Sequence, residues 1–189
     1  NLDPHEITGQ LYNARFTLGH EIKNIVFMGM GEPLDNIDNV VQALKIMNEQ
    51  KGFDIAYRRI TVSTAGVASG IEHLGRLGFN GLRLAVSINS ADNQIRSHIM
   101  PINNFVSLKT LKQTLLSYPL NKRGSFLFEY ILIKGLNDSK KDAISLAQYI
   151  DPLPVRLNLI PYNNVEGFNY PSPSDDEINR FAEYLTENG

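Results

Sequence analysis

The sequence predicts an α/β fold, a partial (β/α) barrel of the TIM-like kind that is truncated at its N-terminal first strand. From residue 24 onward, short runs rich in Val, Ile, Leu and Phe alternate with amphipathic stretches of helical period, a pattern typical of β-α-β units around a parallel sheet. The 189 residues, 42% hydrophobic and 20% charged, match one ordinary globular core. We therefore expect a single domain over residues 1–189.

Five strands are predicted where the apolar residues are densest, as in strands that are covered on both faces. They span residues 24–30, 59–63, 81–88, 125–133 and 155–160. Right-handed crossovers between such strands place the ligand site of a βα barrel at the carboxyl ends of the strands. Functional side chains are therefore expected directly after each strand.

Helices are predicted where apolar residues recur at helical spacing. The four stripes are Val40, Val41, Leu44 and Met47; Leu108, Leu111 and Leu115; Ile144, Ala147 and Ile150; and Ile178, Phe181 and Leu185. A fifth stripe at the N-terminus predicts a helix that follows a strand outside this sequence, and it consists of Ile7, Leu11, Ala14 and Leu18. Helix starts are expected at Asp3, Ser139 and Ser174, and near Asp92.

Composition excludes several classes of site. The absence of cysteine excludes disulfides and thiolate metal sites within this chain, and the scattered histidines do not predict a metal site. A net charge of -2 argues against a domain that grips nucleic acid by bulk charge, so any RNA contact must be local. No apolar run is long enough to span a membrane, and we expect a cytoplasmic protein without a membrane partner.

The first two predicted strands are followed by candidate binding residues. Gly31 and Glu32 follow the first, where a glycine permits close backbone approach and a carboxylate suits an ammonium group; the alternative is that Glu32 caps the next helix. Ser63 ends the second strand, where its hydroxyl and that of Thr64 suit a ligand carboxylate or ribose; capping of the next helix is the alternative.

The later strands supply a second group of candidates. Ser87, Ile88 and Asn89 form a polar cluster at the end of the third strand, and Asn158 interrupts the fifth as an amide that must find hydrogen-bond partners if buried. Glu129 lies inside the fourth strand, where pairing with another protein group is favoured over a position in the barrel mouth.

Basic residues also occur next to the strands. The pairs Arg58-Arg59 and Lys122-Arg123 precede strands, which predicts a position at the amino-terminal face, opposite the ligand site, as solvated charges. Lys134 follows the fourth strand instead, at the end where ligands bind.

Four segments of the chain stand out together. They read Asn-Ile-Val-Phe-Met-Gly-Met-Gly-Glu-Pro-Leu from residue 24, Arg-Arg-Ile-Thr-Val-Ser-Thr-Ala-Gly from residue 58, Met-Pro-Ile-Asn from residue 100 and Leu-Asn-Leu-Ile-Pro-Tyr-Asn from residue 157. In order and spacing these segments resemble the RlmN/Cfr family of radical S-adenosylmethionine RNA methyltransferases. The resemblance runs through nearly the whole chain. It implies a partial βα barrel, with this chain beginning after the three-cysteine motif that binds a [4Fe-4S] cluster.

The resemblance also implies which residues hold S-adenosyl-L-methionine. Gly31 and Glu32 would receive the methionine amino group, and Ser63, the stretch from Ser87 through Ile88 to Asn89, and Asn158 would line the same cofactor. The family usually has histidine where this chain has Asn89, which keeps a hydrogen-bonding group but loses a titratable ring.

The function implied by the resemblance is methylation of carbon 2 of adenine in 23S rRNA and in tRNA. A methyl group passes from one cofactor molecule to a cysteine. A second cofactor molecule is cleaved to a deoxyadenosyl radical, which attacks the adenine through the methylcysteine. That cysteine would follow Gly189, so no catalytic residue is expected in this chain, which would be inactive by itself. An electron donor such as flavodoxin is the other implied partner.

Two other functions are open from the residues alone. One is a Schiff-base lyase of βα-barrel form, because Lys134 would act as a nucleophile if desolvated. The other is a non-catalytic module that binds the cofactor or RNA, which the absence of cysteine permits.

Overall fold

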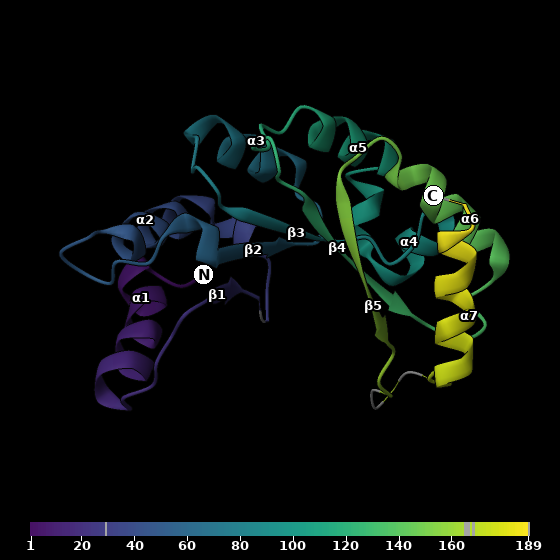
Figure 1. Cartoon of the computed structure of the whole chain (residues 1–189), viewed down its shortest axis with the longest axis horizontal. Coiled ribbons are helices and arrows are strands. Elements are labelled where there is room, and N and C mark those ends of the chain that lie inside the picture. The colour runs from purple at the N-terminus through teal and green to yellow at the C-terminus, as the bar shows by residue number, and fades with distance from the viewer. Residues whose placement is uncertain (29, 165–166, 168, 189) are drawn as a thin grey trace.

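Five parallel strands form one sheet in which spatial order follows chain order, β1-β2-β3-β4-β5. The computed structural model describes residues 1–28, 30–164, 167 and 169–188, so Gly29 and Gly189 of the expectations above lie outside the described residues. The strands are β1 (Ile25–Phe27), β2 (Ile60–Thr64), β3 (Arg83–Ser87), β4 (Phe126–Leu132) and β5 (Val155–Pro161) (Figure 1). The predicted α/β fold with a parallel sheet is confirmed.

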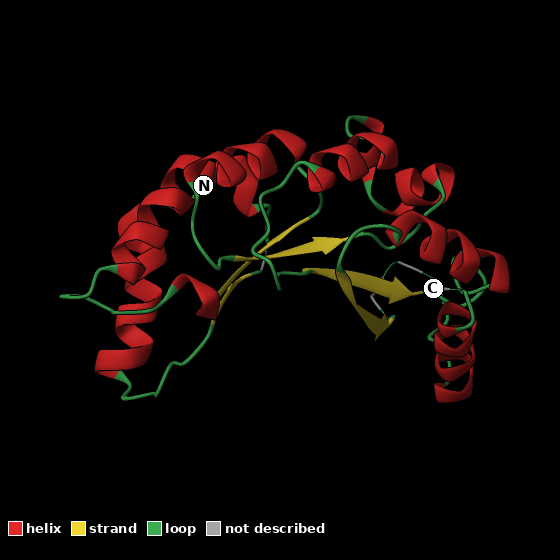
Figure 2. Cartoon of the chain, turned by 45° about the horizontal axis from the view of Figure 1, so that its top comes forward, coloured by secondary structure: helices red, strands yellow, loops and turns green. Residues whose placement is uncertain are grey.

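In the part of the chain that the structure describes, seven α-helices connect and flank the strands. They are α1 (Pro4–Tyr12), α2 (Ile37–Asn48), α3 (Ala68–Leu77), α4 (Asn93–Ile99), α5 (Leu108–Leu116), α6 (Lys140–Ile150) and α7 (Asp175–Thr186). Figure 2 shows the helices as an arc over one side of the curved sheet, with the other side open. The chain therefore has the layering of a partial barrel, with helices outside a concave sheet.

The strands differ in how far they are buried: β2 is buried at all five positions, as predicted for a strand covered on both faces, whereas that prediction is wrong for β4 and β5. Along β4, fully buried residues such as Phe126 and Phe128 alternate with half-buried ones such as Leu127 and Glu129. Side chains alternate between the faces of a strand, so the buried set packs on the helices and the other set lines the concave face. Within the described residues, no helix is long and apolar enough to cross a membrane.

Three of the five predicted helix faces are confirmed and two are corrected. The stripes of α2 and α5 are buried as predicted, and in α7 Phe181 is buried while Ile178 and Leu185 pack partly buried against the core. In α6 the buried residues are Ala143, Leu146 and Ala147, so the face is rotated from the predicted one. The N-terminal stripe ends early because a π-helical turn, Asn13–Thr17, follows α1 and changes the residue spacing; Leu18 is 62% exposed.

The helix starts lie where their polar residues predict them. The Asp92 carboxylate accepts hydrogen bonds from the backbone N–H groups of Gln94 and Ile95, at 2.7 and 3.2 Å. Ser139 and Ser174 cap α6 and α7 in reciprocal capping boxes with Asp142 and Glu177. Such caps satisfy backbone donors that a helix start otherwise leaves without a partner.

Candidate functional site at the carboxyl edge of the sheet

Three polar side chains form one row across the concave face. Ser87 of β3 is in register with Glu129 of β4, and Glu129 is in register with Asn158 of β5. Registered residues on neighbouring parallel strands lie about 4.8 Å apart and point to the same face. The three side chains come from separate parts of the chain and together make a continuous polar strip.

Burial decreases across this row. Ser87 and Glu129 are half-buried and Asn158 is exposed, so the Asn158 amide does not need the protein partners that the sequence predicts for a buried amide. Within the part of the chain that the structure describes, Glu129 takes part in no ion pair, so the structural pairing predicted for it is wrong. Burial raises the pKa of the Glu129 carboxyl group.

Ser63 lies on the same face, nearer the amino end of the sheet. It is in register with Ala85, two residues before Ser87 on β3. Its neighbour Thr64 forms the turn after β2, because the Thr64 hydroxyl accepts hydrogen bonds from the N–H groups of Gly66 and Val67 at 3.0 and 3.3 Å. The turn therefore uses Thr64 rather than Ser63.

Glu32 joins the ends of β1 and β2. One carboxylate oxygen accepts the N–H of Leu34 at 3.0 Å, which caps the short helix Pro33–Asn36, and the other accepts the N–H of Ala65 at 2.7 Å. Glu32 therefore caps the helix that follows it, which the sequence analysis gave as the alternative to ligand binding. A carboxylate has about four lone-pair sites, so an ammonium ligand remains compatible with both bonds.

Gly31 precedes Glu32 with a backbone φ of 119° and is exposed. A side chain at this position would be strained, although it would meet no other atom within 4 Å. Glycine is therefore required here by the backbone turn that delivers Glu32, and the turn leaves the backbone accessible.

Asn89 is tied into the protein rather than turned to the concave face. Its φ of 55° lies in the left-handed region, which Asn adopts more readily than most residues. The side-chain oxygen accepts the Ile131 N–H at 2.9 Å, and the side-chain nitrogen lies 3.2 Å from the Met100 sulfur. Ile88, beside it, is fully buried in the core, so its side chain is not on the open face.

Asn137 locks this loop from the other side. It is fully buried, and its amide nitrogen donates to the backbone carbonyls of Asn89 and Ile131 at 2.7 and 2.8 Å. Its amide oxygen accepts the N–H of Ile133 at 2.7 Å. The loops after β3 and β4 are therefore joined by one side chain.

Arg96 of α4 organises the same edge. Its guanidinium is fully buried and donates to the carbonyls of Ile88, Ala65 and Ser87, at 3.1, 2.7 and 3.3 Å. It also donates to the Asn103 side-chain oxygen at 2.9 Å. Burial lowers the pKa of Arg96. One side chain therefore fixes the ends of both β2 and β3, next to Ser63 and Ser87.

Two further residues make room for Arg96 and orient it. Asn103 donates its amide to the carbonyl of Asn93 and the hydroxyl of Ser97, at 3.1 and 2.8 Å, which points its oxygen toward Arg96. Gly66, with a φ of 109°, has an Arg96 nitrogen 3.3 Å from where a β-carbon would lie. The glycine after Ser63-Thr64-Ala65 and the Asn of Met100-Pro-Ile-Asn thus serve one buried cation.

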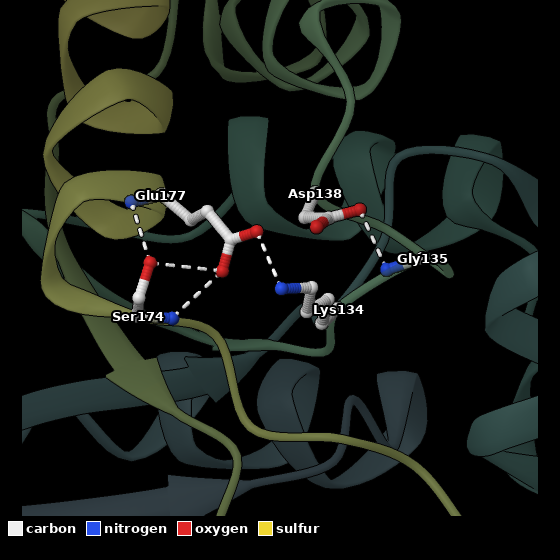
Figure 3. A network of polar contacts seen from close by, with 5 residues as sticks. All are labelled: Lys134, Gly135, Asp138, Ser174 and Glu177. Carbon is white, nitrogen blue, oxygen red and sulfur yellow. Dashed lines mark hydrogen bonds and ion pairs between the residues drawn. The ribbon is translucent and has the colours of Figure 1, made fainter.

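Lys134 lies at the carboxyl end of β4 in an ion pair. Its ammonium is 2.7 Å from a carboxylate oxygen of Glu177, whose other oxygen accepts hydrogen bonds from Ser174 (Figure 3). The hydrogen bonds from Lys134 and Ser174 lower the pKa of Glu177 to about 2. A Schiff-base lysine is activated by loss of solvent or a nearby cation, and the half-exposed Lys134 has an anionic partner instead.

Sequence reasoning missed the residues that build the edge. Arg96 reads as a surface charge in the sequence of α4, and Asn137 as part of a polar turn. The signal that was present is Asn103, because it belongs to a quoted family segment and a buried Asn requires partners. The segment is explained by its contact with Arg96.

Comparisons with known proteins agree with this architecture. Residues 5–147 match the model of the Radical SAM superfamily. A protein of Desulfotalea psychrophila named dual-specificity RNA methyltransferase RlmN is 40% identical over 99% of this chain and 54% of its own length. One of the same name from Geobacter sulfurreducens is 43% identical over 99% of this chain and 51% of its own length.

A solved structure matches the whole chain. The crystal structure of a radical SAM methyltransferase from Sphaerobacter thermophilus superimposes with a TM-score of 0.93 at 35% identity, and the match covers 100% of this chain and 56% of the other. The chain thus spans about half the length of the curated relatives it matches. It belongs to the radical SAM superfamily, and in sequence it is similar to RNA methyltransferases of the RlmN type.

Proposed function

We propose that this chain is the cofactor-binding part of an RNA methyltransferase that uses S-adenosylmethionine to methylate carbon 2 of adenine in 23S rRNA and in tRNA. The single observation that carries the proposal is the row formed by Ser87, Glu129 and Asn158 on the concave face. Ser87 is the last residue of β3, and Glu129 and Asn158 lie halfway along β4 and β5. The row is therefore on the open face of a parallel sheet, in which βα-barrel enzymes place their ligands toward the carboxyl ends of the strands.

The residues of this face fit S-adenosylmethionine. Ser63, Ser87 and Asn158 offer hydroxyl and amide groups to the ribose and base, and Glu32 offers carboxylate lone pairs to the ammonium. Gly31 brings the backbone close to the methionine end. Ile88 and Asn89 act by shaping the loop, because the polar side-chain atoms of Asn89 are already engaged within the protein.

The iron–sulfur cluster does not fit the residues of this chain. It contains no cysteine, whereas [4Fe-4S] clusters are held by cysteine thiolates. The cluster ligands and the methyl-carrying cysteine must therefore come from elsewhere in the full-length protein, and residues 1–189 are proposed to be part of its radical SAM core domain, inactive when isolated.

When bound, the cofactor supplies the transferred methyl group and a carbon-centred radical. The residues of this chain bind and orient it. Arg96 holds the loops after β2 and β3 fixed, so that Ser63 and Ser87 keep their spacing. An electron donor such as flavodoxin and a cytoplasmic location complete the proposal.

The function is tested with the full-length protein. After anaerobic reconstitution with iron and sulfide, it is incubated with 23S rRNA, tRNA and S-adenosylmethionine, and the RNA is digested and analysed by mass spectrometry. The expected product is 2-methyladenosine. Reconstituted protein that cleaves the cofactor but yields no methylated adenine would contradict the RNA substrate.

A matched pair of variants ties activity to the row. Asn158→Ala removes an exposed amide of β5 and is expected to raise the KM for the cofactor. Asn179→Ala removes an exposed amide of α7, away from the concave face, and is expected to change nothing. Equal behaviour of the two variants would show that the row is not the binding site.

A further inference from the structure

Four arginines line one pocket at the opposite edge of the sheet, where the strands begin. Arg58 precedes β2, Arg83 begins β3, Arg123 precedes β4 and Arg156 lies at the start of β5. The pocket has a volume of about 890 Å³ and is lined by all four. Segments from four separate parts of the sequence thus bring guanidinium groups to one place.

The charges in this pocket are not balanced by the protein. No Asp or Glu of residues 1–28, 30–164, 167 and 169–188 lines it. Among the described residues, none of the four arginines takes part in an ion pair, and all four are exposed. The chain as a whole carries a net charge of -2, so this concentration of positive charge is local. Like charges repel, and an anionic ligand would relieve that repulsion.

The backbone at this edge is built to bring the arginines together. Gly81 has a φ of 89°, and a β-carbon there would lie 3.3 Å from the Arg58 β-carbon. Gly124 closes a turn by donating its N–H to the Asn121 carbonyl at 2.7 Å, which fixes the loop that carries Arg123. The loops before β3 and β4 are therefore held against the pocket.

We infer that this arginine pocket binds the phosphodiester backbone of the RNA substrate, an assignment that rests on the function proposed above. The planar guanidinium donates paired hydrogen bonds that match a phosphate. The four strand starts span about 14 Å, at about 4.8 Å between neighbours, which suits an extended polyanion.

Backbone contact is favoured over base contact by the aromatic residues of the pocket. Phe79 packs on Tyr57 with ring centroids 4.9 Å apart, and Tyr118 packs edge-on against Phe126 at 5.8 Å. These rings belong to the core rather than forming a stacking platform for bases. Glu129 of the row lies three residues, about 10 Å, from the first residue of β4, a distance that a folded RNA bridges while presenting one adenine to the concave face.

The test measures RNA binding by the full-length protein at several salt concentrations. A fluorescent 23S rRNA fragment is titrated with wild type, with Arg58→Gln/Arg123→Gln/Arg156→Gln, and with the control Lys45→Gln/Lys109→Gln/Arg180→Gln. The control removes the same charge from exposed positions outside the pocket. Each phosphate contact to single-stranded RNA contributes about 0.7 to the magnitude of the slope of log affinity against log salt concentration. The pocket variant loses three contacts, so we expect its slope to be smaller by about 2, and the control variant's slope to be unchanged.

Four further results separate the alternatives. Arg58→Lys/Arg123→Lys/Arg156→Lys keeps the charges and should keep most of the slope. If the pocket and control variants show equal salt slopes while the wild-type protein still methylates RNA, the pocket does not bind the RNA backbone, but the proposed function stands. Stronger competition by polyglutamate or by inorganic phosphate than by RNA would assign the pocket to an acidic polypeptide or a free anion and overturn the RNA assignment. A wild type that neither binds nor methylates RNA would overturn both.

Discussion

The two edges of the sheet use arginine in opposite ways. At the carboxyl edge, Arg96 is fully buried and donates to three backbone carbonyls and one amide oxygen. At the amino edge, four exposed arginines share a pocket without acidic neighbours. A buried cation that uses four of its five N–H donors within the protein holds structure together, whereas exposed cations without partners are available to a ligand. The comparison separates residues that build a site from residues that bind.

The largest effect is expected at Arg96. Arg96→Met keeps a long side chain but removes the guanidinium donors to the carbonyls of Ala65, Ser87 and Ile88, of which, among the described residues, only Ile88 retains another donor, the N–H of Ser90. We expect the free energy of unfolding to fall by on the order of 3–5 kcal/mol. Urea denaturation measures it, with Arg123→Met at the amino edge as the control that should change little. A similar loss of unfolding free energy in both variants would contradict the claim that arginine is structural at the carboxyl edge and not at the amino edge.

A smaller loss of stability is expected at Asn137, which joins the loops after β3 and β4. Asn137→Ala removes two donated hydrogen bonds and one accepted bond in a fully buried position. The expected cost is about 2–3 kcal/mol. Asn121→Ala, which changes an exposed loop amide, is the control for the same denaturation experiment. A neutral Asn137→Ala would show that the loops are held by packing alone.

Glu32 combines a structural and a proposed binding role, which two substitutions separate. Glu32→Ala loses the bonds to Leu34 and Ala65, and we expect about 1–2 kcal/mol of lost stability together with weaker cofactor binding. Glu32→Gln keeps an acceptor for one N–H but carries no charge for the ammonium. It should therefore lose less stability while still weakening binding in a calorimetric titration. Unchanged binding in Glu32→Gln would leave capping as its role.

The smallest stability effect is expected at Glu129, and it depends on pH. Burial raises the pKa of its carboxyl, so the folded protein favours the protonated form. A carboxyl with a raised folded-state pKa destabilises the fold when ionised, so its destabilising effect appears as the pH rises above the ordinary value of about 4.3. Glu129→Gln should remove this small loss. Identical pH profiles of thermal unfolding would mean that Glu129 is not desolvated.

The sequence predicted the strands and their order well because apolar runs and turn residues are local signals. It placed Ser63 and Ser87 at the ends of their strands and Asn158 within the fifth, and the strand bounds agree to within one residue; their binding of the cofactor stays a prediction. Burial was less predictable. Asn158 proved exposed and Glu129 proved unpaired among the described residues, because which face of a strand meets the helices depends on the curvature of the whole sheet. Arg96 could not be found, since its acceptors lie up to 31 residues away.

The central claim is that the row on the concave face binds S-adenosylmethionine, and calorimetry on the reconstituted full-length protein tests it most directly. Ser87→Ala/Asn158→Ala is compared with Ser117→Ala/Asn179→Ala, which removes the same groups from exposed helix positions. We predict that the first variant binds S-adenosylmethionine at least tenfold more weakly, because each lost hydrogen bond costs about 1 kcal/mol. The affinity of the second variant should equal that of the wild type. Equal affinities in both variants, with both proteins folded, would contradict the claim.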